Sequence, residues 1–325
     1  MSIVELESTR APDAGEPRFS LARMEAIWGY VFISPWLIGF ALLTAIPMIA
    51  TLVFTFTNVS LAGDEPLRFV GFDNYEQMLG DPRTWDALGA TLRFAAIALP
   101  IGLLVPFAVA LMLNSKSLRG SRYFQALFFM PFVIPFVAAL FAWSGMLNPQ
   151  TGWINGLLDF IGIEGKDWIN DPNWIYPSLV LIGIWGVGSA IIINIAGLQN
   201  VPSELYDAAR VDGAGWWGQL RHVTLPLMSP VIFYSVTLTT IGVLQYFLVP
   251  LVLNGGDGRP AGTTYFMNVH IYKTFFTFQD MSAGATLAWF LFLVILAFTL
   301  ILFWSARYWV YYAGETAGRP ARRTS

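Results

Sequence analysis

The residue types that usually perform covalent or metal chemistry are scarce in this chain. It has no cysteine, and its two histidines, His222 and His270, are isolated and expected to be solvated or interfacial. Thiolate nucleophiles, disulfide scaffolds and histidine- or cysteine-rich metal sites are therefore excluded. No GxxxxGK[ST] phosphate loop is present either. We predict no catalytic residue, no metal site and no cofactor on this chain.

The segment from Val201 to Pro226 carries the clearest pattern of charged and small residues. Ser203 is a candidate N-cap, and Glu204 and Asp207 fall in the first turns of the helix that follows, where the helix dipole favours negative charge. Gly213 can take the left-handed conformation that ends such a helix.

This segment also offers a surface to another protein. Leu205, Ala208 and Ala209 are expected on one helical face, and the alanines would allow a close approach. A second short helix is then expected to run to Pro226. The pattern indicates a helix–turn–helix that inserts into a cleft on another subunit. The alternative is an amphipathic loop that lies on lipid headgroups.

Composition places the surrounding elements in a membrane. Of the 325 residues, 56% are hydrophobic and 12% are charged, whereas a soluble domain carries about a quarter charged residues. Six charge-free windows each hold the ~20 mainly apolar residues of a spanning helix. They are 27–63, 94–115, 123–158, 172–203, 222–256 and 281–306. Because these runs do not alternate, they predict helices and not barrel strands.

We therefore predict an all-α polytopic membrane protein with about six transmembrane helices. The expected helix cores are 27–56, 91–113, 123–146, 174–198, 226–251 and 284–306. They lie in a transmembrane domain over 27–312, preceded by a partly disordered arm at 1–26 and followed by a tail at 313–325. Glu5 and Glu7 lie where a signal peptide would carry positive charge, so no cleaved leader is expected.

Basic residues set the predicted orientation, because cytoplasmic loops carry an excess of them. With six spans, the termini and the loops 114–122 and 199–225 share one side, which holds 12 Lys and Arg residues. The opposite side holds six, together with 12 acidic residues. Both termini are thus predicted to be cytoplasmic. A net charge of −3 leaves no basic surface for nucleic acid.

Ionisable residues are nearly absent from the predicted spans, although ion-coupled carriers usually keep some there. Arg93 alone lies near a span, about one turn inside the second, where snorkelling to the headgroups accounts for it. The energy for uphill transport would therefore come from a partner. An ion-coupled secondary transporter of a small polar solute is the alternative. Pro131 and Pro135 could break the third span, but no convincing counterpart follows in the second half.

The 201–226 segment resembles the Glu-Ala-Ala signature of permease subunits from binding-protein-dependent ABC importers. In that signature EAA is followed after three residues by Gly, and nine residues later by Ile-x-Leu-Pro. Here 207–209 reads Asp-Ala-Ala, Gly213 follows, and 223–226 reads Val-Thr-Leu-Pro. Asp for Glu and Val for Ile are conservative departures. The resemblance implies that the residues which couple the subunit to an ATPase are Glu204, Asp207, Ala208, Ala209, Asp212, Gly213, Leu225 and Pro226.

Further segments between residues 27 and 312 resemble the carbohydrate-uptake class of these permeases, of the larger maltose-type or glycerol-phosphate-type subunit. They include Phe-Val-Gly-Phe-Asp-Asn-Tyr at 69–75, Gly-Trp-Ile-Asn at 152–155 and Leu-Asn-Gly-Gly at 253–256, although Asp257 replaces the usual proline. The resemblance implies a bacterial cytoplasmic (inner) membrane protein that forms half of a sugar path. It also implies a second homologous permease subunit, expected in a heterodimer, two copies of an ATPase subunit that hold ATP and Mg, and an extracytoplasmic sugar-binding protein.

The resemblance also implies a substrate site on the fourth and fifth spans. The matching positions are Trp185, Gly186, Gly188, Ser189, Leu244, Gln245 and Tyr246. Gln245 is the leading candidate, because an amide within a span is costly unless it is hydrogen-bonded. A hydrogen bond to a neighbouring helix is the alternative role for Gln245, and also for Asn194.

Overall fold

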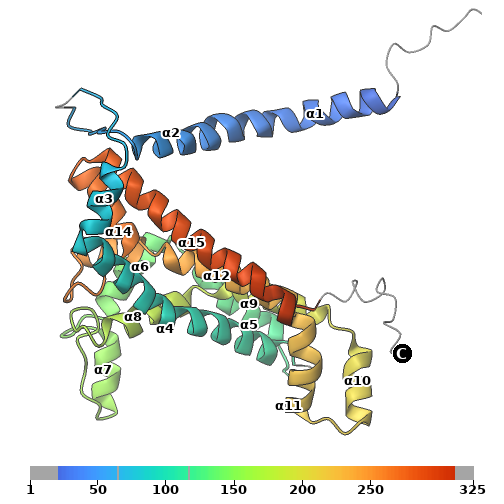
Figure 1. Ribbon diagram of the computed structural model, residues 1–325. Helices are drawn as coiled ribbons and strands as arrows, with labels where there is room; N and C mark the ends of the chain where they lie inside the picture. The colour runs from blue at the N-terminus through green and yellow to red at the C-terminus, as the bar shows by residue number, and fades with distance from the viewer. Residues whose placement is uncertain (1–20, 64–65, 116–117, 312–325) are drawn as a thin grey trace, which may run out of the picture. The chain divides into compact units, whose positions relative to one another are not determined.

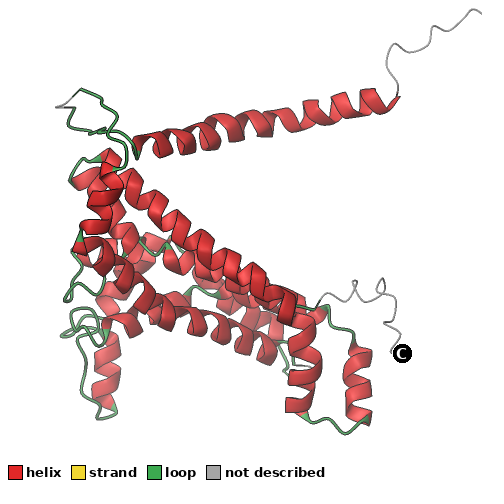
Figure 2. Ribbon diagram, in the orientation of Figure 1, coloured by secondary structure: helices red, strands yellow, loops and turns green. Residues whose placement is uncertain are grey.

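The computed structural model describes residues 21–63, 66–115 and 118–311. The first 20 residues of the predicted arm and the whole predicted tail lie outside this range. Within the described part the regular elements are all helices, as predicted, and no strand forms (Figure 2). Two isolated bridges, Thr57 to Phe69 and Ser60 to Asp280, tie the segment after the first span to later parts of the chain.

The chain divides into two units, residues 1–53 and 54–325. The first contains α1 (Leu21–Phe40), a π-helical turn (Ala41–Ala45) and most of α2 (Ile46–Phe54). Together they form one apolar helix over Ala22–Phe54, long enough to cross a membrane and close to the predicted 27–56. The π-turn precedes Pro47, whose ring would clash with the carbonyl of Leu43 in a regular α-helix.

Three further apolar helices of the second unit meet the length of a membrane span. They are α4 (Pro82–Leu113), the run Trp216–Asn254, and α15 (Met281–Trp309). Asp81 caps α4 by accepting a hydrogen bond from the Arg83 N–H at 3.0 Å, and Asp280 caps α15 through Ala283 at 2.9 Å. The part of the run called α12 (Leu225–Leu244) packs against both α4 and α15.

The third and fourth spans are bent pairs of helices. α5 (Ser121–Phe129) continues through a 3-10 turn (Met130–Val133) and meets α6 (Phe136–Met146) at 98°. Pro131 and Pro135 flank this bend, as predicted. α8 (Ile175–Trp185) and α9 (Gly188–Gln199) meet at 58°.

Besides 123–146, two further expected helix cores are interrupted in the structure. The expected helix 174–198 breaks at Gly186 and Val187, and the expected helix 226–251 breaks at 245–247, before α13 (Leu248–Asn254). Pro250 favours the second break, because it cannot donate a hydrogen bond to the carbonyl of Tyr246 and its ring crowds that group. Broken spans thus do occur in the second half of the chain.

Several short helices of the second unit lie at its two ends (Figure 1). α3 (Asp73–Gly80), α7 (Trp153–Phe160) and α14 (Met267–Tyr272) lie at one end, called here the α7 end. α10 (Ser203–Val211) and α11 (Trp216–Gln219) lie at the other, the α10 end. The long helices α4, α12 and α15 connect the two ends.

His270, at the α7 end, departs from the prediction that it is solvated. Its side chain is 5% exposed, and its Nδ1 lies 3.1 Å from the Tyr265 hydroxyl. Burial lowers the pKa of His270 below its usual 6.5, and Arg83 acts in the same direction, whereas Asp81 opposes both. The imidazole is therefore held in its neutral form.

This burial predicts a loss of stability in mild acid. As pH falls below about 6.5, the unfolded chain binds a proton on His270 that the folded chain resists, so unfolding becomes easier. We expect the melting temperature of the purified protein to fall between pH 7.5 and pH 5.5, as recorded by intrinsic fluorescence. His270→Gln should flatten this dependence, and the exposed His222→Gln should not. If the melting temperature of His270→Gln depended on pH as steeply as that of the wild type, the assignment to His270 would be contradicted.

Candidate functional site

The loop at the α10 end is built around a well-formed helix terminus. Gly213 has φ +80°, in the left-handed region. Its N–H donates to the Arg210 carbonyl at 3.0 Å, and the Ala214 N–H donates to the Ala209 carbonyl at 2.8 Å. This pair of bonds is the Schellman motif that ends a helix at glycine. The predicted helix stop at Gly213 is thus confirmed in the structure.

The start of α10 differs from the prediction. Ser203 is the first helical residue and makes no capping hydrogen bond, because the N-cap position is occupied by Pro202. Glu204 lies in the first turn, and Asp207 pairs with Arg210 on the exposed side of the helix. The acidic first turn therefore remains, although the cap is not the one predicted.

The two arms of the loop are joined by side chains that the sequence pattern did not single out. The hydroxyls of Tyr206 and Thr224 lie 3.1 Å apart, and Thr224 is buried. The Gln219 amide donates to the Ala214 carbonyl at 3.0 Å. These contacts connect α10 to the beginning of the next helix, so that the loop is stiffened.

The predicted second short helix is not separate from the fifth span. α11 continues through a π-helical segment (Leu220–Thr224) directly into α12. The π-segment contains His222, which is four residues before Pro226, the same arrangement as Leu43 and Pro47 in the first span. If the loop were displaced, α12 would therefore move with it.

One side of the loop is open and the other faces the bundle. Glu204, Leu205, Ala208 and Val211 are exposed, and Val211 is 87% exposed. Ala209, predicted to share a face with Leu205 and Ala208, is half-buried instead. A cavity of about 510 Å³ separates α10 from the ends of α4 and α9. Asp212 and Leu225, the other predicted coupling residues, are also exposed.

The predicted substrate positions lie at the two helix breaks. Trp185, Gly186, Gly188 and Ser189 surround the bend between α8 and α9, whereas Leu244, Gln245 and Tyr246 surround the break after α12. Trp185 and Tyr246 pack against the same hydrophobic cluster, which contains Phe94 and Phe266. The structure thus brings one aromatic residue from each set to a shared core.

Within these sets the side chains have different surroundings. Gln245 is exposed, and its backbone carbonyl accepts a hydrogen bond from the Asn268 amide at 2.8 Å. Gly188 is buried against the end of α5, where a Cβ would lie 2.3 Å from the Phe128 carbonyl oxygen. The buried amide of Asn194 donates to the Ala190 carbonyl of its own helix at 2.8 Å. Gln245 keeps the exposed amide expected of a ligand contact, while Gly188 and Asn194 have evident structural roles.

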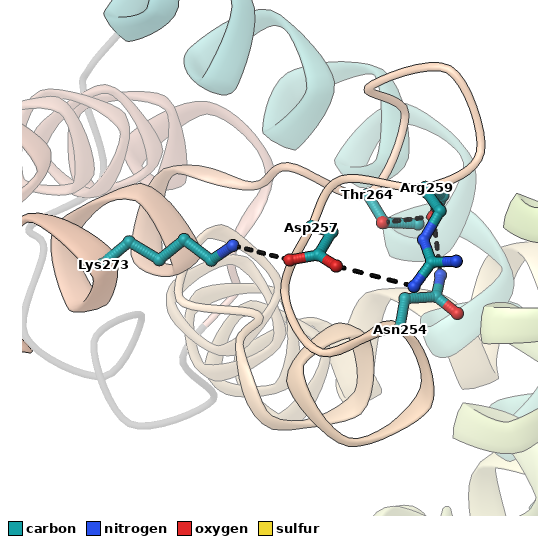
Figure 3. A network of polar contacts seen from close by, with 5 residues as sticks. All are labelled: Asn254, Asp257, Arg259, Thr264 and Lys273. Atoms are coloured by element: carbon teal, nitrogen blue, oxygen red, sulfur yellow. Dashed lines mark hydrogen bonds and ion pairs between the residues drawn. The ribbon is translucent and has the colours of Figure 1, made fainter. Parts of the chain in front are cut away.

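A polar clasp shapes the loop after α13 (Figure 3). The Asp257 carboxylate forms ion pairs with the Lys273 amine at 2.9 Å and with the Arg259 guanidinium at 3.5 Å. The backbone carbonyl of Arg259 accepts hydrogen bonds from the side chains of Asn254 and Thr264, at 2.6 and 2.7 Å. The hydrogen bond and the charge of Lys273 lower the pKa of the Asp257 carboxyl. Asp257 therefore forms an ionic link between the loop after α13 and Lys273, which directly follows α14.

Breaking the clasp should loosen the loop without affecting the bundle. Lys273→Met and Asp257→Asn are each expected to speed hydrogen exchange of the amides in 254–266 at pH 7, because the 2.9 Å contact is lost. Arg259→Gln should have a smaller effect, since its contact is longer and its side chain is 70% exposed. Because the folded pKa of Asp257 is lowered, the link persists above the ordinary value of 3.8 and is lost only as pH falls below it. Unchanged exchange in both Lys273→Met and Asp257→Asn would contradict this.

The fold and the site define a polytopic helical membrane protein with a stiffened loop at one end. The chain belongs to the family described as "Binding-protein-dependent transport system inner membrane component", whose model matches residues 98–310. It is 33% identical to the "Probable ABC transporter permease protein YesP" of Bacillus subtilis, over 90% of this chain and 94% of the relative. It is 30% identical to the "Lactose transport system permease protein LacF" of Rhizobium radiobacter, over 89% and 97% of the two chains.

A solved structure shares the fold. A chain of a bacterial alginate ABC transporter, crystallised in complex with its alginate pentasaccharide-bound periplasmic protein, superposes with a TM-score of 0.77 at 22% identity. The match covers 88% of this chain and 96% of that one. The family, the relatives and the fold together confirm the resemblance drawn from the 201–226 spacing. They also confirm the expectation of a transport subunit that is not itself an enzyme.

Proposed function

We propose that this chain is one half of the membrane path of an ATP-driven sugar importer. The observation that carries the proposal is the loop at the α10 end. The 201–226 segment, which has the motif spacing of the family, forms a stiff unit there that is continuous with α12. Relatives named for lactose transport and for trehalose/maltose transport support a sugar as substrate. Helices with few charges and many aromatic residues suit a neutral polyol, which is bound by stacking and amide hydrogen bonds.

The proposed assembly supplies the energy from outside the chain. A second homologous permease completes the path, two ATPase subunits hold ATP and Mg, and an extracytoplasmic binding protein delivers the sugar. The distribution of basic residues supports a cytoplasmic side for the 199–225 loop and, separately, for the two termini. Closure of the ATPases would push α10, and its links to Thr224 and α12 would convert that push into alternating access. Gln245, at the break after α12, is the proposed contact for the sugar.

Dependence on ATP separates the importer from an ion-coupled carrier. Uptake of a panel of labelled sugars is to be compared between the native strain and one that lacks this chain. We expect the chain-dependent uptake to stop when ATP is depleted with arsenate and to persist when a protonophore collapses the proton gradient. Uptake that fails with the protonophore while ATP is maintained would overturn the proposal in favour of a carrier.

Reversing the charge of Glu204 should uncouple transport. Glu204 is exposed in the first turn of α10, so Glu204→Lys should cost about 0.3–1 kcal/mol through the helix dipole and leave the protein folded. Uptake should nevertheless fall to a small fraction of wild type, because the exposed face of α10 is the proposed contact with the ATPase. Glu76→Lys, in the first turn of α3 at the opposite end, is the matched control and should transport normally. Equal uptake by the two variants would contradict the assigned surface.

A further inference from the structure

α7 carries an apolar stripe that the rest of the described chain leaves uncovered. Trp153, Leu157, Phe160 and Ile161 recur at the spacing of one helical face and are all exposed. Trp153 is 76% exposed and Phe160 is 88% exposed. Asp159, on a different part of the circumference, is the one charged residue of this helix.

The opposite side of α7 is fixed by a single buried amide. Asn155 donates to the Pro149 and Lys166 carbonyls at 3.0 and 2.9 Å, and accepts from the Lys166 N–H at 3.1 Å and the Trp168 indole at 2.6 Å. Gly165 lies against it so closely that a Cβ there would come within 2.7 Å of the Asn155 Cγ. α7 is therefore prevented from rolling to bury its stripe, and the direction of the stripe is set by the fold.

The helix also sits where a membrane surface is expected. It begins seven residues after α6 ends at Met146, and the chain returns to the membrane at Ile175. The turn between α6 and α7 is tight, because a Cβ on Gly152 would lie 2.4 Å from the Met146 carbonyl oxygen. In Figure 1 α7 runs across the direction of α4. The N-terminal end of α7 is thus closely tied to the end of α6.

Charge is segregated around α7. The segment between α7 and α8 carries the charged residues Glu164, Lys166, Asp167 and Asp171. The stripe has no charged side chain, and its one side-chain hydrogen-bond donor is the indole N–H of Trp153. A protein interface usually makes about one hydrogen bond per 100–200 Å², so a stripe with a single side-chain donor is poorly suited to a protein partner. In the sequence, the stripe comes after Val137 and Phe141 of α6, which are also exposed apolar residues and belong to the third span. These features favour lipid over a protein partner as the material that covers the stripe.

We propose that α7 is an interfacial anchor that lies in the headgroup region, with its stripe against the lipid. Trp153 and Phe160 would occupy the level at which aromatic residues concentrate in membrane proteins. The assignment to the outer leaflet rests on the proposed orientation, whereas the contact with lipid does not. Such an anchor would hold the ends of the third and fourth spans at a fixed depth.

The absence of cysteine makes a direct test possible. Spin labels are to be placed on Leu157→Cys, Phe160→Cys and, as the matched control, Asp159→Cys, in the full chain purified with its co-purifying partners and reconstituted in phosphatidylethanolamine/phosphatidylglycerol nanodiscs. Collision rates with oxygen, which concentrates in lipid, and with a water-soluble nickel chelate are then compared. We expect the ratio of oxygen to nickel accessibility to exceed one at positions 157 and 160 and to be below one at 159.

Two results would overturn the proposal. Nickel accessibility that dominates at 157 and 160 would show that the stripe faces water and is open to a soluble partner. Low accessibility to both reagents would show that a protein surface covers it. Either result is independent of ATP-driven uptake, so the failure of this inference would be distinguishable from failure of the proposed function.

Discussion

Replacement of Gly213 by valine is expected to abolish uptake while leaving the amount of protein in the membrane close to wild type. Gly213 has φ +80°, a conformation that costs an ordinary L-residue about 1–2 kcal/mol and suits a β-branched residue even less. Apart from the two neighbours of Gly213 in the chain, no described residue has an atom within 4 Å of the position that a Cβ would occupy, so the effect arises from backbone strain and not from a clash. Valine should therefore unwind the end of α10 and turn it away from its proposed ATPase contact. The measurement is chain-dependent sugar uptake, normalised to membrane-inserted protein.

Two substitutions control for this interpretation. Gly213→Asn should retain most of the activity, because asparagine tolerates the left-handed conformation better than other residues. Gly215→Ala, two residues away at φ −69°, should transport normally. Normal uptake by Gly213→Val, or failure of Gly213→Asn as severe as that of valine, would contradict the role given to this helix terminus.

The second large effect is expected at Gly188, where even alanine should destabilise the folded chain. Its Cβ would lie 2.3 Å from the Phe128 carbonyl oxygen and 3.0 Å from the Phe129 Cα, and both are backbone atoms that cannot move aside cheaply. Overpacking of this kind typically costs about 1–3 kcal/mol and occasionally more. We expect Gly188→Ala to lower the yield of monodisperse protein and its melting temperature in detergent.

Gly186→Ala provides the matched control at the same helix break. The nearest atom to its Cβ would be the Gly183 carbonyl oxygen, at 3.7 Å, and φ is −94°. This variant should fold normally. A Gly188→Ala protein of normal yield and melting temperature that fails only in sugar uptake would contradict the packing role and support the substrate role inferred from the family resemblance.

Much of the fold follows from the distribution of charge. Six windows without charged residues locate the apolar helices, because a charged side chain is costly within the membrane. Pro131 and Pro135 correctly predict the sharp bend in the third span, and Gly213 correctly predicts the end of α10. In each of these cases a local property of one residue or one window is sufficient.

The remaining features depend on contacts between distant residues. The link between Tyr206 and Thr224, the burial of His270 and the clasp of Asp257 by Lys273 require the folded chain to bring their partners together. The break before α13 did have a local signal, because Pro250 cannot donate a hydrogen bond to the Tyr246 carbonyl and its ring crowds that group. The coupling surface rests on motif spacing, and it remains a prediction, as do the substrate positions at the two breaks.

The central claim is that this chain transmits ATPase movement to a membrane path. Its most direct test is affinity purification of the tagged full-length chain from native membranes in mild detergent, with the partners identified by mass spectrometry. We predict recovery of an ATPase subunit and a second six-span permease, with ATP hydrolysis in the purified complex. Recovery of this chain alone, still able to drive uptake without ATP, would contradict the account.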